Sequence, residues 1–169
     1  VDHLAHRGLA VEARVAHHAH AKRRLLVVLL KLARGLAGEH LQVISVVNFK
    51  GGSGKTTTTA HLAQYLALTG HRVLAIDLDP QASLTALHGI QPELDKNPSL
   101  FEALRYDDER RSIKDIIQAT NFPGLDIVPA NLELQEYEYE TPLAAANSHE
   151  GRLFFTRISK ALKEVDDEY

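Results

Sequence analysis

Apolar and polar residues are distributed along the chain in a pattern that predicts an α/β fold. Residues 43–47 are β-branched apart from Ser45, and this run predicts a buried strand of a parallel sheet. Residues 56–69 place apolar side chains at helical spacing, and Gly70 follows where a helix C-cap is expected. Residues 72–78 predict a second strand. A strand, a helix and a second strand in this order predict a right-handed βαβ unit, and therefore a mostly parallel sheet with flanking helices.

The second half of the chain predicts four further elements. Ser99 and Glu102 have the spacing of a capping box and predict the start of a helix. Residues 112–119 predict another short helix, and residues 125–128 predict a third strand. Residues 150–165 predict an amphipathic helix whose apolar face consists of Phe154, Ile158, Ala161, Leu162 and Val165. Because such a helix normally leads back to another strand, we expect the sheet of the intact protein to continue beyond these residues.

The first 38 residues differ in composition from the rest of the chain. They contain no Ser, Thr, Asn, Gln, Pro, Ile, Phe or Tyr, and they hold seven Lys and Arg against two Asp and Glu. The composition changes near Glu39. We therefore divide the chain into a biased basic segment, residues 1–38, and a folded domain, residues 39–169.

Four interpretations of residues 1–38 remain open. The segment is a basic helix for nucleic acid, or a secretory signal with basic residues 22–24 ahead of the apolar run 25–30. It is alternatively a metal site that uses His17, His18 and His20. The fourth interpretation is non-native sequence, such as a GC-rich region translated in the wrong frame, and the abrupt change of composition favours it.

Overall composition excludes several classes of protein. Hydrophobic residues make up 44% of the chain and charged residues 24%, with a net charge of -3, as in globular proteins. The absence of cysteine excludes disulfides, thiolate zinc sites and cysteine-held iron–sulfur clusters from this stretch. The longest apolar run, residues 25–30, is far below the ~20 residues that a membrane-spanning helix needs. We expect a cytoplasmic protein without membrane contact.

A glycine-rich loop joins the first predicted strand to the first predicted helix. Its residues are Lys50, Gly51, Gly52, Ser53, Gly54, Lys55, Thr56 and Thr57. Glycines let consecutive backbone N–H groups point inward, and the helix N-terminus adds partial positive charge at the same place. We expect Lys55 to reach the β- and γ-phosphates of a nucleotide, Thr56 to ligate Mg²⁺ and Thr57 to contact the α-phosphate. The loop therefore predicts a site for Mg-ATP.

The loop departs from the standard P-loop pattern in an informative way. Phe49 stands where the first glycine of that pattern belongs, and a second lysine, Lys50, precedes the glycines. Asp77 and Asp79 end the second predicted strand, and carboxylates at that edge of a parallel sheet face the ligand crevice. Carboxylates placed there could bind a metal ion or hold a water molecule beside a ligand. The alternative is that they only cap the turn before Pro80.

These residues together resemble the ParA family of partition ATPases, which have a deviant Walker A loop. The similarity covers roughly residues 39–169, and within the family it is greatest to the RepA group of repABC-type plasmids. The resemblance implies a Rossmann-like P-loop NTPase fold that hydrolyses ATP to ADP and phosphate. By the same resemblance, Lys50 reaches the phosphates of a partner subunit, Asp79 positions the attacking water and Asp77 supports the Mg²⁺ shell. Lys50, Lys55 and Asp79 are thus the expected catalytic residues.

The resemblance also implies partners. Family members form ATP-dependent homodimers, bind DNA nonspecifically and respond to a ParB-type protein, here a RepB-like one, during plasmid segregation on the nucleoid. The family's Walker B strand and its DNA-contacting segments come later than residue 169, so the chain corresponds to the N-terminal part of the ATPase domain. Two alternatives remain open: a nucleotide-binding but catalytically inactive fragment, and a division-site ATPase of the MinD kind. A relative of the nitrogenase iron protein is excluded because it would need cysteines.

Overall fold

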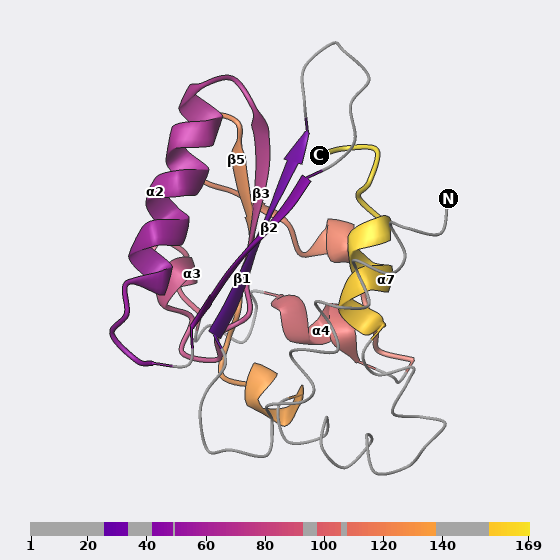
Figure 1. Ribbon diagram of the computed structural model, residues 1–169. Coiled ribbons are helices and arrows are strands. Elements are labelled where there is room, and N and C mark those ends of the chain that lie inside the picture. The colour runs from indigo at the N-terminus through magenta and orange to yellow at the C-terminus, as the bar shows by residue number, and fades with distance from the viewer. Residues whose placement is uncertain (1–25, 34–41, 49, 93–97, 106–107, 138–155) are drawn as a thin grey trace.

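The computed structural model describes residues 26–33, 42–48, 50–92, 98–105, 108–137 and 156–169. A five-stranded sheet in the order β2-β1-β3-β5-β4 lies between helices on its two faces (Figure 1). The elements are β1 (Leu26–Ala33), β2 (Gln42–Asn48), α2 (Lys55–Leu68), β3 (Arg72–Asp77), α3 (Ser83–Leu87), α4 (Leu100–Leu104), the 3-10 turn η1 (Ile113–Asp115), β4 (Gln118–Ala119), β5 (Leu125–Val128) and α7 (Arg157–Lys163).

Strand β1 occupies the position between β2 and β3 and runs antiparallel to both. Its Leu30 pairs with Ile44 of β2 on one side and with Ala75 of β3 on the other. Strands β2 and β3 therefore run in the same direction, and their C-terminal ends lie at the same edge of the sheet. The helical interpretation of the N-terminal segment is wrong for Leu26–Ala33, while residues 1–25 and 34–38, with the three-histidine cluster, lie outside the described residues.

The α/β class is confirmed, but the sheet is mixed rather than mostly parallel. Among the described strands, β3 and β5 form a parallel pair, and the other three pairings are antiparallel. The first predicted strand was expected to be buried, and this expectation is wrong. Because β1 lies beside β3, β2 is an edge strand, and its Val43 and Val47 are 48% and 46% exposed.

Helix α2 covers one face of the sheet through small side chains. The predicted helix 56–69 is confirmed within one residue at each end. Ala60 and Ala63 are fully buried in one apolar cluster with Val73, Ala75, Leu125 and Ile127 of β3 and β5. Alanine at these positions lets the helix approach the sheet closely.

The opposite face of the sheet carries α4, η1 and α7 (Figure 1). Its core combines Leu74 and Ile76 of β3 with large apolar residues from these segments, namely Leu100, Leu104, Ile113 and Ile116. The predicted capping box is confirmed: the Ser99 amide donates to Glu102 Oε2 at 2.7 Å, and the Phe101 amide donates to Ser99 Oγ at 3.2 Å. Helix α4 therefore begins where the sequence predicts.

Two predicted helices differ from the structure. Residues 112–119 form η1 and then β4, because Gln118 and Ala119 pair with β5, and this tertiary pairing replaces helical hydrogen bonds. Of the helix predicted over residues 150–165, the structure shows α7, and residues 150–155 lie outside the described part. Ala161 and Val165 are buried as expected.

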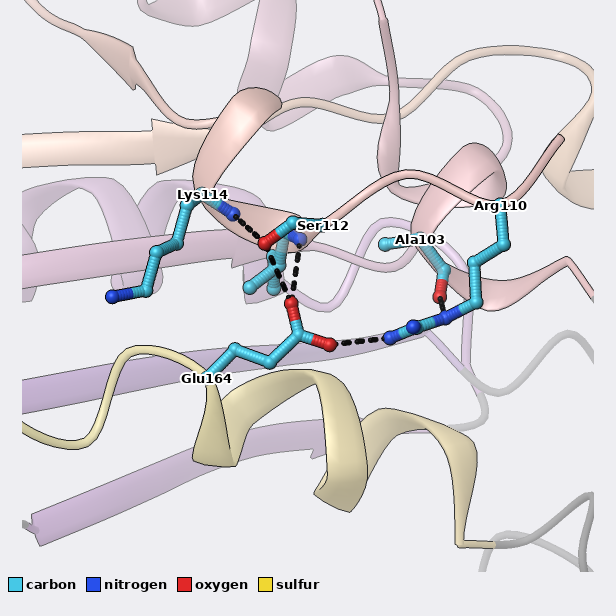
Figure 2. Close-up of polar contacts among 6 residues, drawn as sticks. Ala103, Arg110, Ser112, Lys114 and Glu164 are labelled. Atoms are coloured by element: carbon cyan, nitrogen blue, oxygen red, sulfur yellow. Dashed lines mark hydrogen bonds and ion pairs between the residues drawn. The ribbon is translucent and has the colours of Figure 1, made fainter.

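Glu164 ties the end of α7 to the segment around η1 (Figure 2). Its carboxylate accepts hydrogen bonds from Arg110 Nη2 at 2.5 Å, Ser112 Oγ at 2.7 Å and the Ile113 amide at 3.1 Å. Arg110 Nε also donates to the carbonyl oxygen of Ala103 in α4. The Glu164 cluster (Arg110, Ser112, Ile113 and Glu164) thus links three segments on this face of the sheet.

Candidate phosphate-binding site

The glycine-rich loop follows β2 and leads directly into α2, as predicted. Residues 50–54 are all exposed. Gly52 and Gly54 have φ angles of 69° and 82°, in the left-handed region that glycine adopts most easily. A Cβ atom added at either position would meet no atom within 4 Å, so the backbone conformation and not the available space requires glycine. We call residues 50–55 the phosphate loop.

Lys55 folds back over the phosphate loop. Its Nζ donates to the carbonyl oxygen of Lys50 at 3.0 Å and lies 3.5 Å from Ser53 Oγ. Lys55 as a whole is only 9% exposed, so the ammonium group is held against the loop instead of extending into solvent. This position places a positive charge on an exposed glycine-rich loop, which favours an anion such as a polyphosphate.

The first turn of α2 strengthens the same site. The helix is 14 residues long, and its first turn contains no acidic residue that would offset the partial positive charge of its N-terminus. Thr56 is half-buried and Thr57 is exposed in that turn. Lys50 is exposed at the other end of the loop, where its backbone amide donates to Asn48 Oδ1 at 2.9 Å. All the predicted phosphate-contacting residues therefore lie on one short segment.

The two predicted carboxylates follow β3, in a segment that we call the aspartate turn (residues 77–85). Asp77 is 1% exposed, whereas Asp79 is half-buried. Asp77 Oδ1 accepts from the Asp79 amide at 3.1 Å, and Asp77 Oδ2 accepts from the amide and hydroxyl of Thr85 at 2.9 and 2.7 Å. Burial raises the pKa of Asp77 above its ordinary value, although the hydrogen bonds from Thr85 act in the opposite direction.

The phosphate loop and the aspartate turn lie at the same edge of the sheet. Strand β1 pairs its Leu26 with Asn48, just before the loop, and its Val28 with Asp77, at the start of the turn. One strand therefore separates β2 from β3, which corresponds to about 9.5 Å between the two strand axes. The loop and the carboxylates thus follow strands that end at the same edge of the sheet, with β1 between those two strands.

Sequence reasoning missed the residue that organises the aspartate turn. Thr85 is fully buried; besides its contacts with Asp77, its Oγ1 accepts from the Ala130 amide at 3.0 Å. Ala130 follows β5 and is 45 positions away in sequence. No local pattern could have indicated this contact, since it depends on β5 pairing with β3.

The oxygen-bearing residues at this edge fit magnesium better than a transition metal. Within the described part of the chain, no group of three or more His, Cys, Asp or Glu side chains could hold a metal ion by itself. Mg²⁺ is commonly held by one or two protein oxygens together with substrate phosphates, and Thr56 and Asp79 could offer such oxygens.

In the part of the chain that the structure describes, no helix has the length and apolar character needed to cross a membrane.

Comparisons with known proteins identify the family of the chain. The family described as an AAA domain matches residues 41–169. The chain is 78% identical over 135 residues to the "Putative replication protein A" of Sinorhizobium fredii, which covers 79% of this chain and 33% of that protein. It is 35% identical over 114 residues to the chromosome partitioning protein ParA of Caulobacter vibrioides, covering 68% of this chain and 41% of that protein.

A solved structure shows the same fold. The crystal structure of cobyrinic acid a,c-diamide synthase from Mycobacterium smegmatis, with bound ATP analogue and magnesium, matches with a TM-score of 0.58 and 31% identity. The match covers 72% of this chain and 45% of the synthase chain. The chain spans about a third of the length of its Sinorhizobium relative. On the family match, the P-loop fold and these relatives, the chain belongs to the AAA-domain family and, within it, to the ParA group of P-loop proteins.

Proposed function

We propose that this chain is the nucleotide-binding part of a ParA-type partition ATPase and that its phosphate loop binds Mg-ATP. The observation that carries the proposal is the conformation of the loop. Two glycines in the left-handed region precede a 14-residue helix, and Lys55 lies folded over an exposed loop. The ATP analogue and magnesium in the related synthase structure support the same ligand.

Each predicted residue has a proposed role at this site. Lys55 binds the β- and γ-phosphates, Thr57 contacts the α-phosphate, and the backbone amides of residues 51–54 cradle the phosphate chain. Thr56 offers an oxygen atom to Mg²⁺, Asp77 supports the shell of the ion and Asp79 holds its water, and the ion would neutralise charge on the phosphates when bound. Lys50 is exposed, as a residue that reaches a second subunit must be.

The activity of the longer protein is a further part of the proposal. We infer that the intact protein hydrolyses ATP to ADP and phosphate, dimerises with ATP, binds DNA nonspecifically and responds to a ParB-type or RepB-like partner during plasmid segregation in the cytoplasm. The partition protein among its relatives supports this inference. Asp79 then orients the attacking water, and Lys50 stabilises charge on the partner subunit's nucleotide.

Titration of the 169-residue chain with a fluorescent ATP analogue and Mg²⁺ tests the binding proposal. We expect saturable binding that Lys55→Ala weakens about 10- to 100-fold, since a charge-assisted contact to phosphate is lost. Lys160→Ala is the matched control, because it removes the same side chain from an exposed position on α7. Absence of binding by the unmodified chain, or equal loss in both variants, would contradict the proposal.

Phosphate release separates binding from turnover. For the 169-residue chain we expect nucleotide binding with little or no hydrolysis, because the chain spans about a third of the length of its Sinorhizobium relative. A measured rate that Asp79→Ala abolishes would show that the chain is a complete catalyst. Binding without turnover in the intact protein would instead favour the inactive nucleotide-binding module.

A further inference from the structure

We propose that Asp77 is a positioning residue that acts through Thr85 and the Asp79 amide to hold the aspartate turn beside the phosphate loop, and not a direct ligand of the metal. The inference rests on the proposed function, because Asp79 matters only if a nucleotide binds nearby. It concerns a contact that joins the end of β3 and helix α3, which are neighbours in sequence, to the residues after β5, which lie 45 positions beyond Thr85.

The carboxylate of Asp77 is already engaged on both oxygens. Oδ1 accepts from the Asp79 amide, and Oδ2 accepts two hydrogen bonds from Thr85. With 1% of Asp77 exposed, the group has little surface from which to approach an ion. Asp79 differs, because its side chain is half-buried at the edge of the sheet.

The Thr85 hydroxyl accepts one hydrogen bond and donates another, and its partners determine which is which. Its Oγ1 lies 3.0 Å from the Ala130 amide, which can only donate, and 2.7 Å from Asp77 Oδ2. The single hydroxyl hydrogen therefore points to Asp77. Valine at position 85 would remove both contacts and leave the Ala130 amide and one carboxylate oxygen without this partner, whereas serine would retain both.

The turn that Asp77 holds has a demanding backbone. Ala82 has a φ angle of 51°, in the left-handed region that non-glycine residues seldom adopt. Its amide donates to the Asp79 carbonyl oxygen at 2.8 Å, and the Gln81 amide donates to Asp79 Oδ1 at 3.0 Å. Such a conformation persists only when surrounding contacts maintain it. The hydrogen bonds between Asp77 and Thr85 enclose this turn and are placed to maintain it.

Amide hydrogen exchange, measured by NMR on the 169-residue chain, tests the positioning role directly. We expect Asp77→Asn and Thr85→Val each to speed exchange of the Asp79 and Ala82 amides about 10-fold, the factor that corresponds to one net hydrogen bond. The double variant should exchange no faster than the faster single variant, because both changes break the bond from the Thr85 hydroxyl to Asp77 Oδ2. Thr85→Ser should retain slow exchange, and Ser83→Ala, which alters an exposed hydroxyl on the same helix, is the matched control.

A magnesium titration of the fluorescent ATP analogue separates positioning from ligation. If Asp77 positions the turn, Asp77→Asn and Thr85→Val change the Mg²⁺ concentration for half-maximal binding by the same factor. If Asp77 is a ligand, Asp77→Asn raises that concentration while Thr85→Val leaves it at the value of the unmodified chain. The second outcome overturns the inference, as does additive exchange in the double variant.

The two proposals can fail separately. If the unmodified chain binds no nucleotide, the proposed function fails, and the exchange measurement alone still decides whether Asp77 and Thr85 hold the turn. If Asp77→Asn does not fold, the pair Thr85→Val and Thr85→Ser gives the same decision, since these variants differ in the hydroxyl group. Equal exchange in those two variants contradicts the inference.

Discussion

Asp77 and Glu164 make nearly the same hydrogen bonds in two regions of the molecule, yet their pKa values move in opposite directions. Each carboxylate accepts from one hydroxyl and from backbone amides: the Thr85 hydroxyl and the Thr85 and Asp79 amides for Asp77. Glu164 accepts from the Ser112 hydroxyl and the Ile113 amide. The surroundings differ. Asp77 is 1% exposed, whereas the Glu164 side chain is 27% exposed and also meets Arg110.

Burial decides between the two outcomes. Loss of solvent raises the pKa of Asp77 even against its hydrogen bonds. Partial burial also pushes the pKa of Glu164 upward, but hydrogen bonds from Ser112, Arg110 and Ile113 outweigh it, and the pKa is lowered. Similar hydrogen bonds therefore have different effects in the two regions. At the edge of the sheet they stabilise the buried carboxylate of Asp77, and at α7 they attach the end of the helix to the segment around η1.

The largest expected effect on stability comes from removing the Thr85 hydroxyl, which donates to Asp77. Thr85→Val should lower the free energy of unfolding by about 1–3 kcal/mol, because the buried Ala130 amide loses its acceptor and the buried Asp77 Oδ2 loses one of its two donors. Thr85→Ser, which retains the hydroxyl and loses a methyl group, should cost only about 1 kcal/mol. Urea denaturation of both variants measures this order. A less stable serine variant would mean that apolar packing, and not hydrogen bonding, dominates at this position.

An intermediate effect is expected at Glu164, and it depends on pH. Glu164→Gln should lower the free energy of unfolding at pH 7 by about 1 kcal/mol, since charge-assisted bonds become neutral ones. Because the folded-state pKa is lowered, this contribution is complete above the ordinary value of 4.5 and is lost as the pH falls through the folded-state pKa.

Denaturation curves of the unmodified chain and the Gln variant between pH 3 and 7 check the sign. Their difference in stability should shrink toward the acid end. A difference that grows on acidification would show that the pKa of Glu164 is raised, and the contrast with Asp77 would then disappear.

The smallest effect is expected for the ion pair in the Glu164 cluster. The Arg110 side chain is 40% exposed, so its pairing with Glu164 is screened by solvent. Arg110→Met should cost roughly 0.2–1 kcal/mol, with a smaller difference in 0.5 M than in 0.05 M sodium chloride. Thermal unfolding at the two salt concentrations measures this change. A salt-independent loss would point to the bond from Arg110 Nε to Ala103 instead.

Local sequence pattern predicted the elements whose signals are local. Helix α2, strand β5 and the capping box of Ser99 with Glu102 appear where apolar spacing and cap chemistry place them. The phosphate loop is of the same kind, because its glycines, lysine and helix start are consecutive in the chain.

The remaining features depend on contacts between distant segments. The apolar run that becomes β1 has no alternation to mark it as a strand, and its place in the sheet follows only from pairing with β2 and β3. Thr85 is eight residues from Asp77 and 45 from Ala130, so only the assembled sheet brings the three together. The same reason explains why residues 118–119 form a strand and not part of a helix.

Strand β1 separates β2 from β3, and it lies outside the region that matches the family, since Leu26–Ala33 precedes residue 41. A two-residue slip of its ladder against β2 would keep every side chain on its own side of the sheet but carry the phosphate loop about 7 Å along β3. That displacement is comparable with the reach of a lysine side chain. The pairing of β1 with its two neighbours therefore determines where the phosphate loop lies relative to the aspartate turn.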